Sequence, residues 1–191
     1  MTTTTKIENS GRLSGVEKLT AAHDAGAFTC GSHTLDLWLR KYALANQSTV
    51  NSPQTYVVHR QGIVVGYYSL VYGEVSLEQC PPRIRDAMPS RYPVPVIKMT
   101  RLAVDKQEQG HGLGIALMKD MFLRSIAAAE IAGLRAIVVD ALDEQAKRFY
   151  REKFGFDESP IGPLQLFLRI DDVKAAVEAS AQVRSAPATE D

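Results

Sequence analysis

The sequence predicts an α/β fold in which helices flank a mixed central sheet. Three observations carry this prediction: apolar residues recur at helical spacing in some segments, β-branched and aromatic residues dominate others, and the two kinds alternate along the chain. The later half has the order strand, helix, strand, which is typical of a βαβ unit with parallel strands. With 191 residues, 45% of them hydrophobic and 23% charged, the composition is that of a globular protein.

The first half predicts a helix followed by a β-hairpin. Apolar residues spaced three and four apart predict the helix over residues 35–46, with Ser32 or Thr34 as its N-terminal cap. Residues 54–60 and 63–72 are predicted strands, because β-branched and aromatic side chains are frequent in both. The glycine-containing turn between them favours a hairpin.

The second half predicts alternating elements after a proline-rich loop. Five prolines between residues 81 and 95 exclude a long helix or central strand there, so we expect a loop with one short helix near residues 83–87. The later predictions are, in order, a strand over 96–105, a helix over 112–132, a strand over 136–141, a helix over 143–153 ended by Gly155, and a strand over 164–170.

We expect one domain, over residues 13–174. Residues 1–12 are polar and rich in threonine, which predicts a flexible N-terminus. Residues 175–191 are small, polar and without aromatic side chains, which predicts a mostly disordered tail, although its first part could extend a last helix.

Charge and cysteine content exclude several classes of protein. The 22 basic and 22 acidic residues give a net charge of zero, which argues against a nucleic-acid coat or a polybasic membrane anchor. Neither the two cysteines, Cys30 and Cys80, nor the histidines have metal-ligand spacing, so we expect no metal site. Free thiols, together with the lack of a secretory signal or an apolar span, predict a cytoplasmic protein outside the membrane.

The most informative motif is a glycine loop between a predicted strand and a predicted helix. It reads Gln109-Gly110-His111-Gly112-Leu113-Gly114. Free backbone N–H groups at a helix start bind anions, so the loop predicts a phosphate or pyrophosphate site, with an ordinary flexible turn as the alternative. The P-loop and dinucleotide motifs fit poorly, since no Lys-Ser/Thr follows and the glycine spacing differs.

Two motifs have spacings that the predicted elements alone do not explain. The first is RLAVD over 101–105 followed by Gln109-x-x-Gly112-x-Gly114, and the second is Ala146-x-x-Phe149-Tyr150-x-x-x-Phe154-Gly155-Phe156. The first resembles the [Q/R]xxGx[G/A] signature of the GNAT acetyltransferase family, and the second resembles another motif of that family. The resemblance covers residues 13–170 and implies a GNAT fold with acetyl-CoA as cosubstrate. It implies that acetyl-CoA contacts Leu102, Ala103, Val104, Gln109, Gly110, His111, Gly112, Leu113, Gly114 and Phe149.

The N-terminal part contains the stretch Phe28-Thr29-Cys30-Gly31-Ser32-x-x-Leu35-x-x-Trp38-Leu39. This stretch is similar to one in a narrower group, the toxin acetyltransferases of bacterial toxin–antitoxin pairs. This resemblance implies acetylation of the α-amine of aminoacyl-tRNA, inhibition of translation, a ribbon-helix-helix antitoxin that provides any DNA contact, and a homodimer. Acetylation of a small-molecule or protein amine, and a non-catalytic acyl-CoA-binding adaptor, are the alternatives.

The resemblance also implies that Tyr150 is the catalytic acid. A phenol with a pKa of about 10 is protonated at neutral pH and can protonate a thiolate whose pKa is about 8.5. The alternative is that Tyr150 is a packed aromatic, since it shares helical spacing with its apolar neighbours. The strand over 96–105 has no carboxylate before Asp105 to serve as a base, which favours an α-amine, because an α-amine of pKa about 8 is already partly neutral.

A cluster of basic residues predicts contact with a polyanion. Residues 83–101 contain five basic residues against the single acidic residue Asp86. We expect Arg83, Arg85 and Arg91 to contact RNA phosphates. The alternatives are a solvated charged loop or basic groups near the coenzyme phosphates.

Cys30 has no basic neighbours, so we do not expect it to act as a nucleophile.

Overall fold

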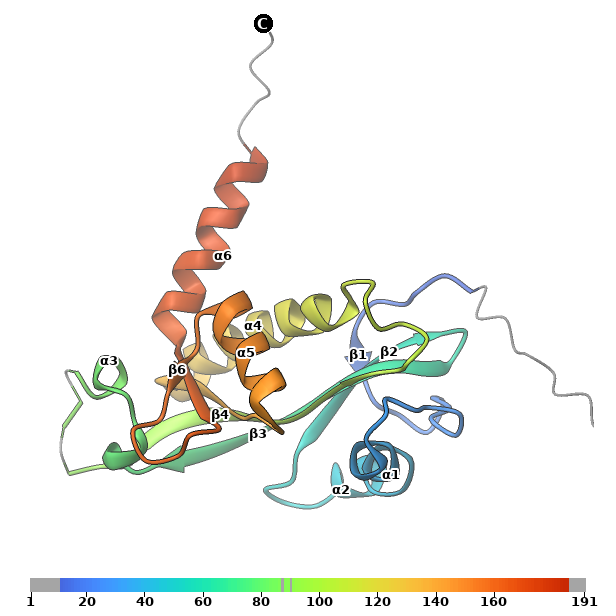
Figure 1. Ribbon diagram of the computed structural model, residues 1–191, viewed down its shortest axis with the longest axis horizontal. Helices are drawn as coiled ribbons and strands as arrows, with labels where there is room; N and C mark the ends of the chain where they lie inside the picture. The colour runs from blue at the N-terminus through green and yellow to red at the C-terminus, as the bar shows by residue number, and fades with distance from the viewer. Residues whose placement is uncertain (1–10, 87, 90, 186–191) are drawn as a thin grey trace, which may run out of the picture. The chain divides into compact units, whose positions relative to one another are not determined.

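In the computed structural model, the described residues (11–86, 88–89 and 91–185) form a seven-stranded mixed sheet with the strand order β1-β2-β3-β4-β5-β7-β6 (Figure 1). This confirms the predicted α/β class. The strands are β1 (Glu17–Lys18), β2 (Gln54–Arg60), β3 (Ile63–Val75), β4 (Val94–Val104), β5 (Ala136–Asp140), β6 (Asp157–Glu158) and β7 (Gln165–Arg169). The helices are α1 (His33–Lys41), α2 (Ala43–Asn46), η1 (Leu77–Gln79), α3 (Pro82–Arg85), α4 (Leu113–Ala132), α5 (Glu144–Phe154) and α6 (Ile170–Ser185).

The chain divides into two compact units. Within the described residues, the first unit comprises 11–69 and 101–118, and the second comprises 70–100 and 119–185. Strands β3 and β4 and helix α4 each contribute residues to both units. The expected single domain over 13–174 stays a prediction.

The first unit is built on the predicted hairpin. Gln61 and Gly62 join β2 to β3 with φ of 51° and 89°, the left-handed values that a two-residue hairpin turn requires. The predicted helix over 35–46 is interrupted at Tyr42, whose φ of −118° separates α1 from α2. The core of this unit comprises Leu19, Phe28, Trp38, Leu39, Ala43, Val57, Val64, Tyr67 and Ala103.

The second unit contains the predicted βαβ arrangement. Strands β4 and β5 pair in parallel, and β5 pairs with β7 in antiparallel orientation. Helix α5 is capped at its N-terminus by Asp143, whose carboxylate accepts the N–H of Ala146, and at its C-terminus by Gly155 with φ of 72°, as predicted. Strand β4 starts earlier than predicted, because Pro95 is tolerated close to a strand's beginning. The core of the second unit comprises Cys80, Ile84, Val94, Val96, Ala136, Val138 and Phe167.

Helix α6 differs from the sequence prediction. It continues through residues 175–185, where a mostly disordered tail was the expectation and an extended last helix the alternative. Figure 1 shows α6 pointing away from the strands of the second unit. Residues 186–191, and residues 1–10 of the expected flexible N-terminus, lie outside the described residues. In the described part of the chain, no helix has the length and apolarity that crossing a membrane requires.

Packing in the first unit leaves no room for a side chain at Gly66. A Cβ there would lie 3.1 Å from both Leu117 Cδ1 and Val58 Cγ1. We therefore expect Gly66→Val to destabilise the protein by about 1–3 kcal/mol, since the added methyl groups overpack the core. Urea unfolding measures the effect. The matched control is Gly73→Val on the same strand, where a Cβ meets nothing within 4 Å; equal losses in both variants would contradict the expectation.

Candidate active site

The glycine loop connects the end of β4 to the start of α4. Gly110 and Gly112 both have φ of +81°, a conformation that side chains with a Cβ rarely adopt. The backbone N–H groups of residues 110–114 donate to no acceptor in the described part of the chain. Unpaired N–H groups at the start of a 20-residue helix point their positive ends outward. The loop can therefore bind an anion such as a phosphate.

Side chains before the glycines hold this loop in place. Gln109 Nε2 donates to the carbonyl oxygens of Cys30 and Val104, both at 2.9 Å. Glu108 forms two hydrogen bonds with the Arg60 guanidinium, at 2.8 and 3.1 Å, which holds the pKa of Glu108 below its ordinary value. The loop is thus anchored to the hairpin and to the segment before α1.

Asp105 provides a further anchor, at the point where β4 ends. Its buried carboxylate accepts the N–H of Thr29 at 2.8 Å and the N–H of Gln107 at 3.0 Å. The N–H of Lys106 donates to the Thr29 carbonyl oxygen at 2.8 Å. Sequence reasoning missed that residues 28–31 hold the glycine loop in place. The one signal in that stretch was its resemblance to the toxin acetyltransferases. The stretch serves as a support for the glycine loop.

The thiol of Cys30 lies in the same region. Burial, followed by the hydrogen bond to Asp36, raises the pKa of Cys30 to about 11. At neutral pH the thiol is therefore protonated, which makes it a poor nucleophile. That Cys30 takes no part in catalysis stays a prediction.

The strand residues predicted to contact acetyl-CoA lie on both faces of β4. Ala103 is buried in the core of the first unit, whereas Leu102 and Val104 are half-buried. Because side chains alternate along a strand, Leu102 and Val104 point to the face opposite Ala103.

Tyr150 belongs to the second unit, where it is a packed aromatic; its role as the catalytic acid stays a prediction. Its ring is 8% exposed and packs against Phe149 and Phe156, with centroids 5.4 and 5.7 Å away. Its hydroxyl makes no hydrogen bond to a described residue. Among the described residues, Arg169 Nε is the one side-chain nitrogen or oxygen that is fully buried and lacks a hydrogen-bond partner. Because the Tyr150 hydroxyl also lacks a partner but is not such a buried atom, it touches solvent. Burial raises the pKa of Tyr150, so the phenol is protonated at neutral pH.

The predicted basic cluster does not form one free patch. Arg83 pairs with Asp157 at 3.6 Å and Asp172 at 2.9 Å, and Lys98 pairs with Asp140 at 2.5 Å. Arg85 and Arg91 are exposed and form no ion pair with a described residue, while Arg101 belongs to the first unit. Acidic residues remote in sequence thus pair with two of the five basic residues, and contact of Arg83, Arg85 and Arg91 with RNA stays a prediction.

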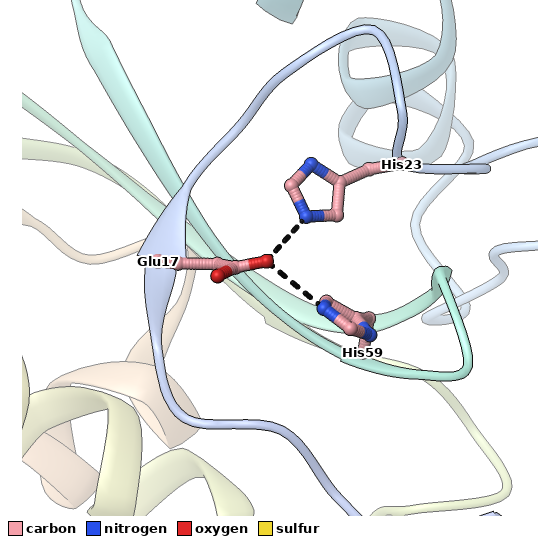
Figure 2. Close-up of side chains that lie close together, drawn as sticks. All are labelled: Glu17, His23 and His59. Atoms are coloured by element: carbon pink, nitrogen blue, oxygen red, sulfur yellow. Dashed lines mark hydrogen bonds and ion pairs between the residues drawn. The ribbon is translucent and has the colours of Figure 1, made fainter.

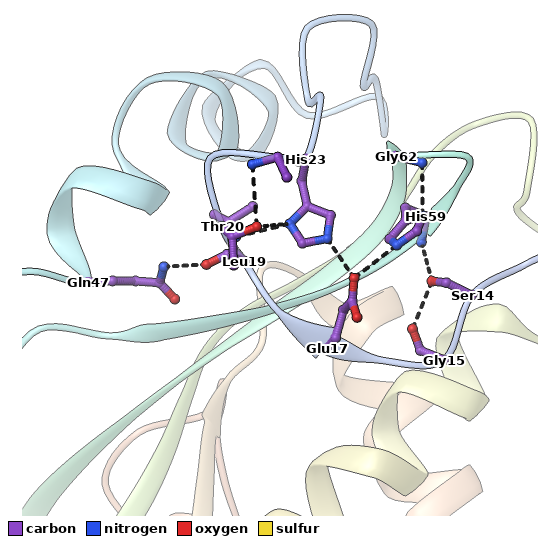
Figure 3. A network of polar contacts seen from close by, with 10 residues as sticks. Ser14, Gly15, Glu17, Leu19, Thr20, His23, Gln47, His59 and Gly62 are labelled. Atoms are coloured by element: carbon purple, nitrogen blue, oxygen red, sulfur yellow. Dashed lines mark hydrogen bonds and ion pairs between the residues drawn. The ribbon is translucent and has the colours of Figure 1, made fainter.

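A second polar cluster in the first unit joins Glu17, His23 and His59 (Figure 2). Glu17 Oε1 lies 2.8 Å from His23 Nε2 and 3.0 Å from His59 Nε2. The other ring nitrogens accept from backbone amides: Thr20 N–H donates to His23 Nδ1 and Gly62 N–H to His59 Nδ1, both at 3.0 Å. The Thr20 hydroxyl also lies 3.1 Å from His23 Nδ1 (Figure 3). Each Nδ1 is therefore an acceptor, and a neutral ring then carries its proton on Nε2.

This arrangement favours a hydrogen-bonded cluster over a metal site. A histidine that binds a metal through Nε2 donates from Nδ1 to an acceptor, whereas here amide donors occupy that position. Both Nε2–H groups instead donate to Glu17, and these bonds hold its pKa below the ordinary value of 4.5. The cluster thus joins β1, the segment after it and the hairpin turn.

Three comparisons describe what the chain is similar to. Residues 51–158 match the acetyltransferase (GNAT) domain family. A tRNA-acetylating toxin of Mycobacterium tuberculosis is 44% identical over 164 residues, which cover 86% of this chain and 96% of that protein. The structure of AtaT complexed with acetyl-methionyl-tRNAfMet has a TM-score of 0.79 at 25% identity, covering 87% of this chain and 99% of that one. AtaTR bound with AcCoA has a TM-score of 0.75 at 25% identity, covering 86% and 98%.

The histidine cluster yields a pH prediction. Because the folded-state pKa of Glu17 is lowered, its contribution to stability is present above pH 4.5 and is lost as the pH falls through the folded-state value. We expect Glu17→Gln to lower the melting temperature at neutral pH, and this difference from wild type to shrink in acid. Glu152→Gln, at an exposed site, is the control.

The same melting experiment tests for a metal. Zinc or a chelator should leave the wild-type melting temperature unchanged. A zinc-dependent rise that Glu17→Gln abolishes would show that the cluster binds a metal despite its tautomers.

Proposed function

This chain belongs to the GNAT acetyltransferase family, and we propose that it transfers the acetyl group of acetyl-CoA to the α-amine of aminoacyl-tRNA. The observation that carries the proposal is the 44% identity to a tRNA-acetylating toxin over almost the whole of that protein. The similarity to AtaT, solved with acetyl-methionyl-tRNAfMet, supports the same substrate class.

The glycine loop holds the pyrophosphate of acetyl-CoA in this proposal. The unpaired N–H groups of residues 110–114 provide donors for its oxygens, and exposed His111 adds a further donor. Gln109 positions these donors through its two backbone contacts. Leu102 and Val104 are the proposed side-chain contacts of the acyl arm along β4, whereas Ala103, whose side chain is buried in the core on the other face, offers only its backbone. Phe149 is the proposed contact from α5.

The available groups suit an α-amine acceptor. Strand β4 has no carboxylate, and the Asp105 carboxylate that follows it already accepts two backbone N–H groups. A lysine side chain, with a pKa of about 10.4, needs a base to become nucleophilic, but an α-amine of pKa about 8 is partly neutral unaided. The lack of a free carboxylate on this strand therefore supports the proposed substrate class.

Tyr150 donates its phenolic proton to the departing sulfur in this mechanism. A protonated phenol whose hydroxyl is open to solvent and makes no competing hydrogen bond fits that role. The packed ring limits the positions that the hydroxyl can take.

The biological role that follows is that of a toxin. Acetylated aminoacyl-tRNA has lost its nucleophilic amine, so translation stops at the elongation step that needs it. The neighbouring structures include AtaT bound to the C-terminus of the antitoxin AtaR and a KacTA–DNA complex. We propose that this chain is likewise neutralised by a ribbon-helix-helix antitoxin, which makes the DNA contacts, and that it acts in the cytoplasm as a homodimer.

Three arginines of the second unit are the proposed RNA contacts. Arg85 and Arg91 are exposed without an ion pair to a described residue, and Arg83 is exposed but paired with two aspartates. The phosphate backbone can compete with such exposed pairs, because surface ion pairs are weak.

Incubation with labelled acetyl-CoA and total aminoacyl-tRNA tests the proposed function. We expect label on the aminoacyl group of charged tRNA. Tyr150→Phe should lower turnover by about 10²–10⁴-fold, the usual contribution of a general acid, while acetyl-CoA affinity by calorimetry stays near wild type. Label on a small molecule or protein would favour the alternative acceptors, and coenzyme binding without turnover on any amine would favour an adaptor.

Gly112→Ala tests the glycine loop. A Cβ at φ +81° costs about 1–2 kcal/mol unless the loop changes shape, so we expect acetyl-CoA affinity to fall about tenfold. Gly133→Ala is the matched control: its φ is +67°, and both positions have open space for a Cβ, but Gly133 lies beyond the far end of α4. The control should lose stability and keep its affinity; unchanged affinity in Gly112→Ala would remove the loop from coenzyme binding.

A further inference from the structure

One arginine of the first unit lies over an aromatic stack. The Arg101 guanidinium carbon lies 4.0 Å from the centroid of the Trp38 ring. The Trp38 ring stacks on Tyr67 with a centroid distance of 5.9 Å and an interplanar angle of 19°. The Tyr67 hydroxyl donates to the Leu35 carbonyl oxygen at 2.9 Å, which fixes the stack to α1. Arg101 is thereby oriented before any ligand arrives.

The charge of Arg101 has no counter-ion in the described part of the chain. The guanidinium makes no hydrogen bond or ion pair there, although the residue is only half-exposed. Burial lowers the pKa of Arg101, an effect that a carboxylate partner would oppose. By contrast, Arg60 and Arg83 each have carboxylate partners. A preoriented guanidinium with unpaired N–H groups is a ready site for a bidentate anion.

The position of Arg101 in β4 separates it from the glycine loop. Alternation places Arg101 on the same strand face as Ala103, which packs in one core cluster with Trp38 and Tyr67. On the neighbouring β3, Gly66 precedes Tyr67 and so faces the opposite side, where Leu113 and Leu117 of α4 contact it. The loop amides belong to the start of α4. Arg101 therefore points to the face away from the helix that would bind the coenzyme pyrophosphate.

The stack also limits how a nucleic acid could contact this place. Arg101 lies over the Trp38 ring and Tyr67 stacks against the same indole, which is only 8% exposed. A nucleobase thus has no indole surface on which to stack, whereas the N–H edges of the guanidinium remain available. These edges match the paired oxygens of a phosphate.

We propose that Arg101, oriented by Trp38, binds a backbone phosphate of the polynucleotide substrate. The proposal rests on the proposed function and assigns a contact that the resemblance did not. A stacked arginine of this kind would position the acceptor strand on the α1 side of β4.

The test compares Arg101→Gln with Arg12→Gln, which removes an exposed arginine elsewhere in the same unit. Binding of uncharged tRNA is measured by fluorescence anisotropy at several salt concentrations, and acetyl-CoA binding by calorimetry. For Arg101→Gln we expect tRNA affinity to fall about 10–100-fold, the slope of log K against log salt to shrink by about one, and acetyl-CoA affinity to stay unchanged. Arg101→Lys, which keeps the charge but lacks the planar fork, should give an intermediate affinity with the wild-type slope.

The outcomes separate this inference from the proposed function. Unchanged tRNA affinity and slope in Arg101→Gln, or a fall in acetyl-CoA affinity instead, would overturn the phosphate contact even if the wild type acetylates charged tRNA. If the wild type binds tRNA without acetylating it, the proposed function fails while the contact is still judged from binding. Should Arg101→Gln fail to fold, Arg101→Lys carries the test, and wild-type affinity in that variant would contradict a bidentate contact.

Discussion

The unpaired backbone amides of the glycine loop are the feature on which the other parts of the candidate site depend. A row of unsatisfied N–H groups is useful only if the loop is held open, since a mobile loop would turn them toward its own carbonyls. Asp105, Glu108 and Gln109 hold the loop in its open shape, because each forms a hydrogen bond with a segment outside the loop. The shape of the loop is therefore set by the protein itself, and the proposed binding of an anion there would lose less entropy than binding to a mobile loop.

A chain with zero net charge can still recognise polyanions because its positive charges differ in availability. Arg60 and Lys98 are neutralised by acidic partners and serve the structure. The loop amides carry partial positive charge that does not come from a basic side chain, and Arg101 carries a full charge with no carboxylate partner among the described residues. Net charge therefore says little about binding here; the pairing of each charge decides it.

The histidine cluster shows that the types of residue in a cluster do not by themselves determine what the cluster does. Two imidazoles and a carboxylate are suitable metal ligands, and their ligand atoms lie within 4.8 Å of one another. The amides of Thr20 and Gly62 nevertheless fix the tautomers so that both rings donate to Glu17. What such a cluster does depends on the hydrogen bonds at its outer side, which a spacing pattern does not contain.

The sequence by itself determined those features whose cause is local. Left-handed glycines, the Asp143 cap and helical or alternating apolar spacing predicted the hairpin, α4, α5 and the glycine turn between β4 and α4, because each depends on a few neighbouring residues. Only the tertiary structure decided that Thr29 supports Asp105 across 76 positions, that Arg83 is paired, and that Arg101 lies on Trp38. These contacts join segments that are remote in sequence, and no local spacing encodes which segments the sheet brings together.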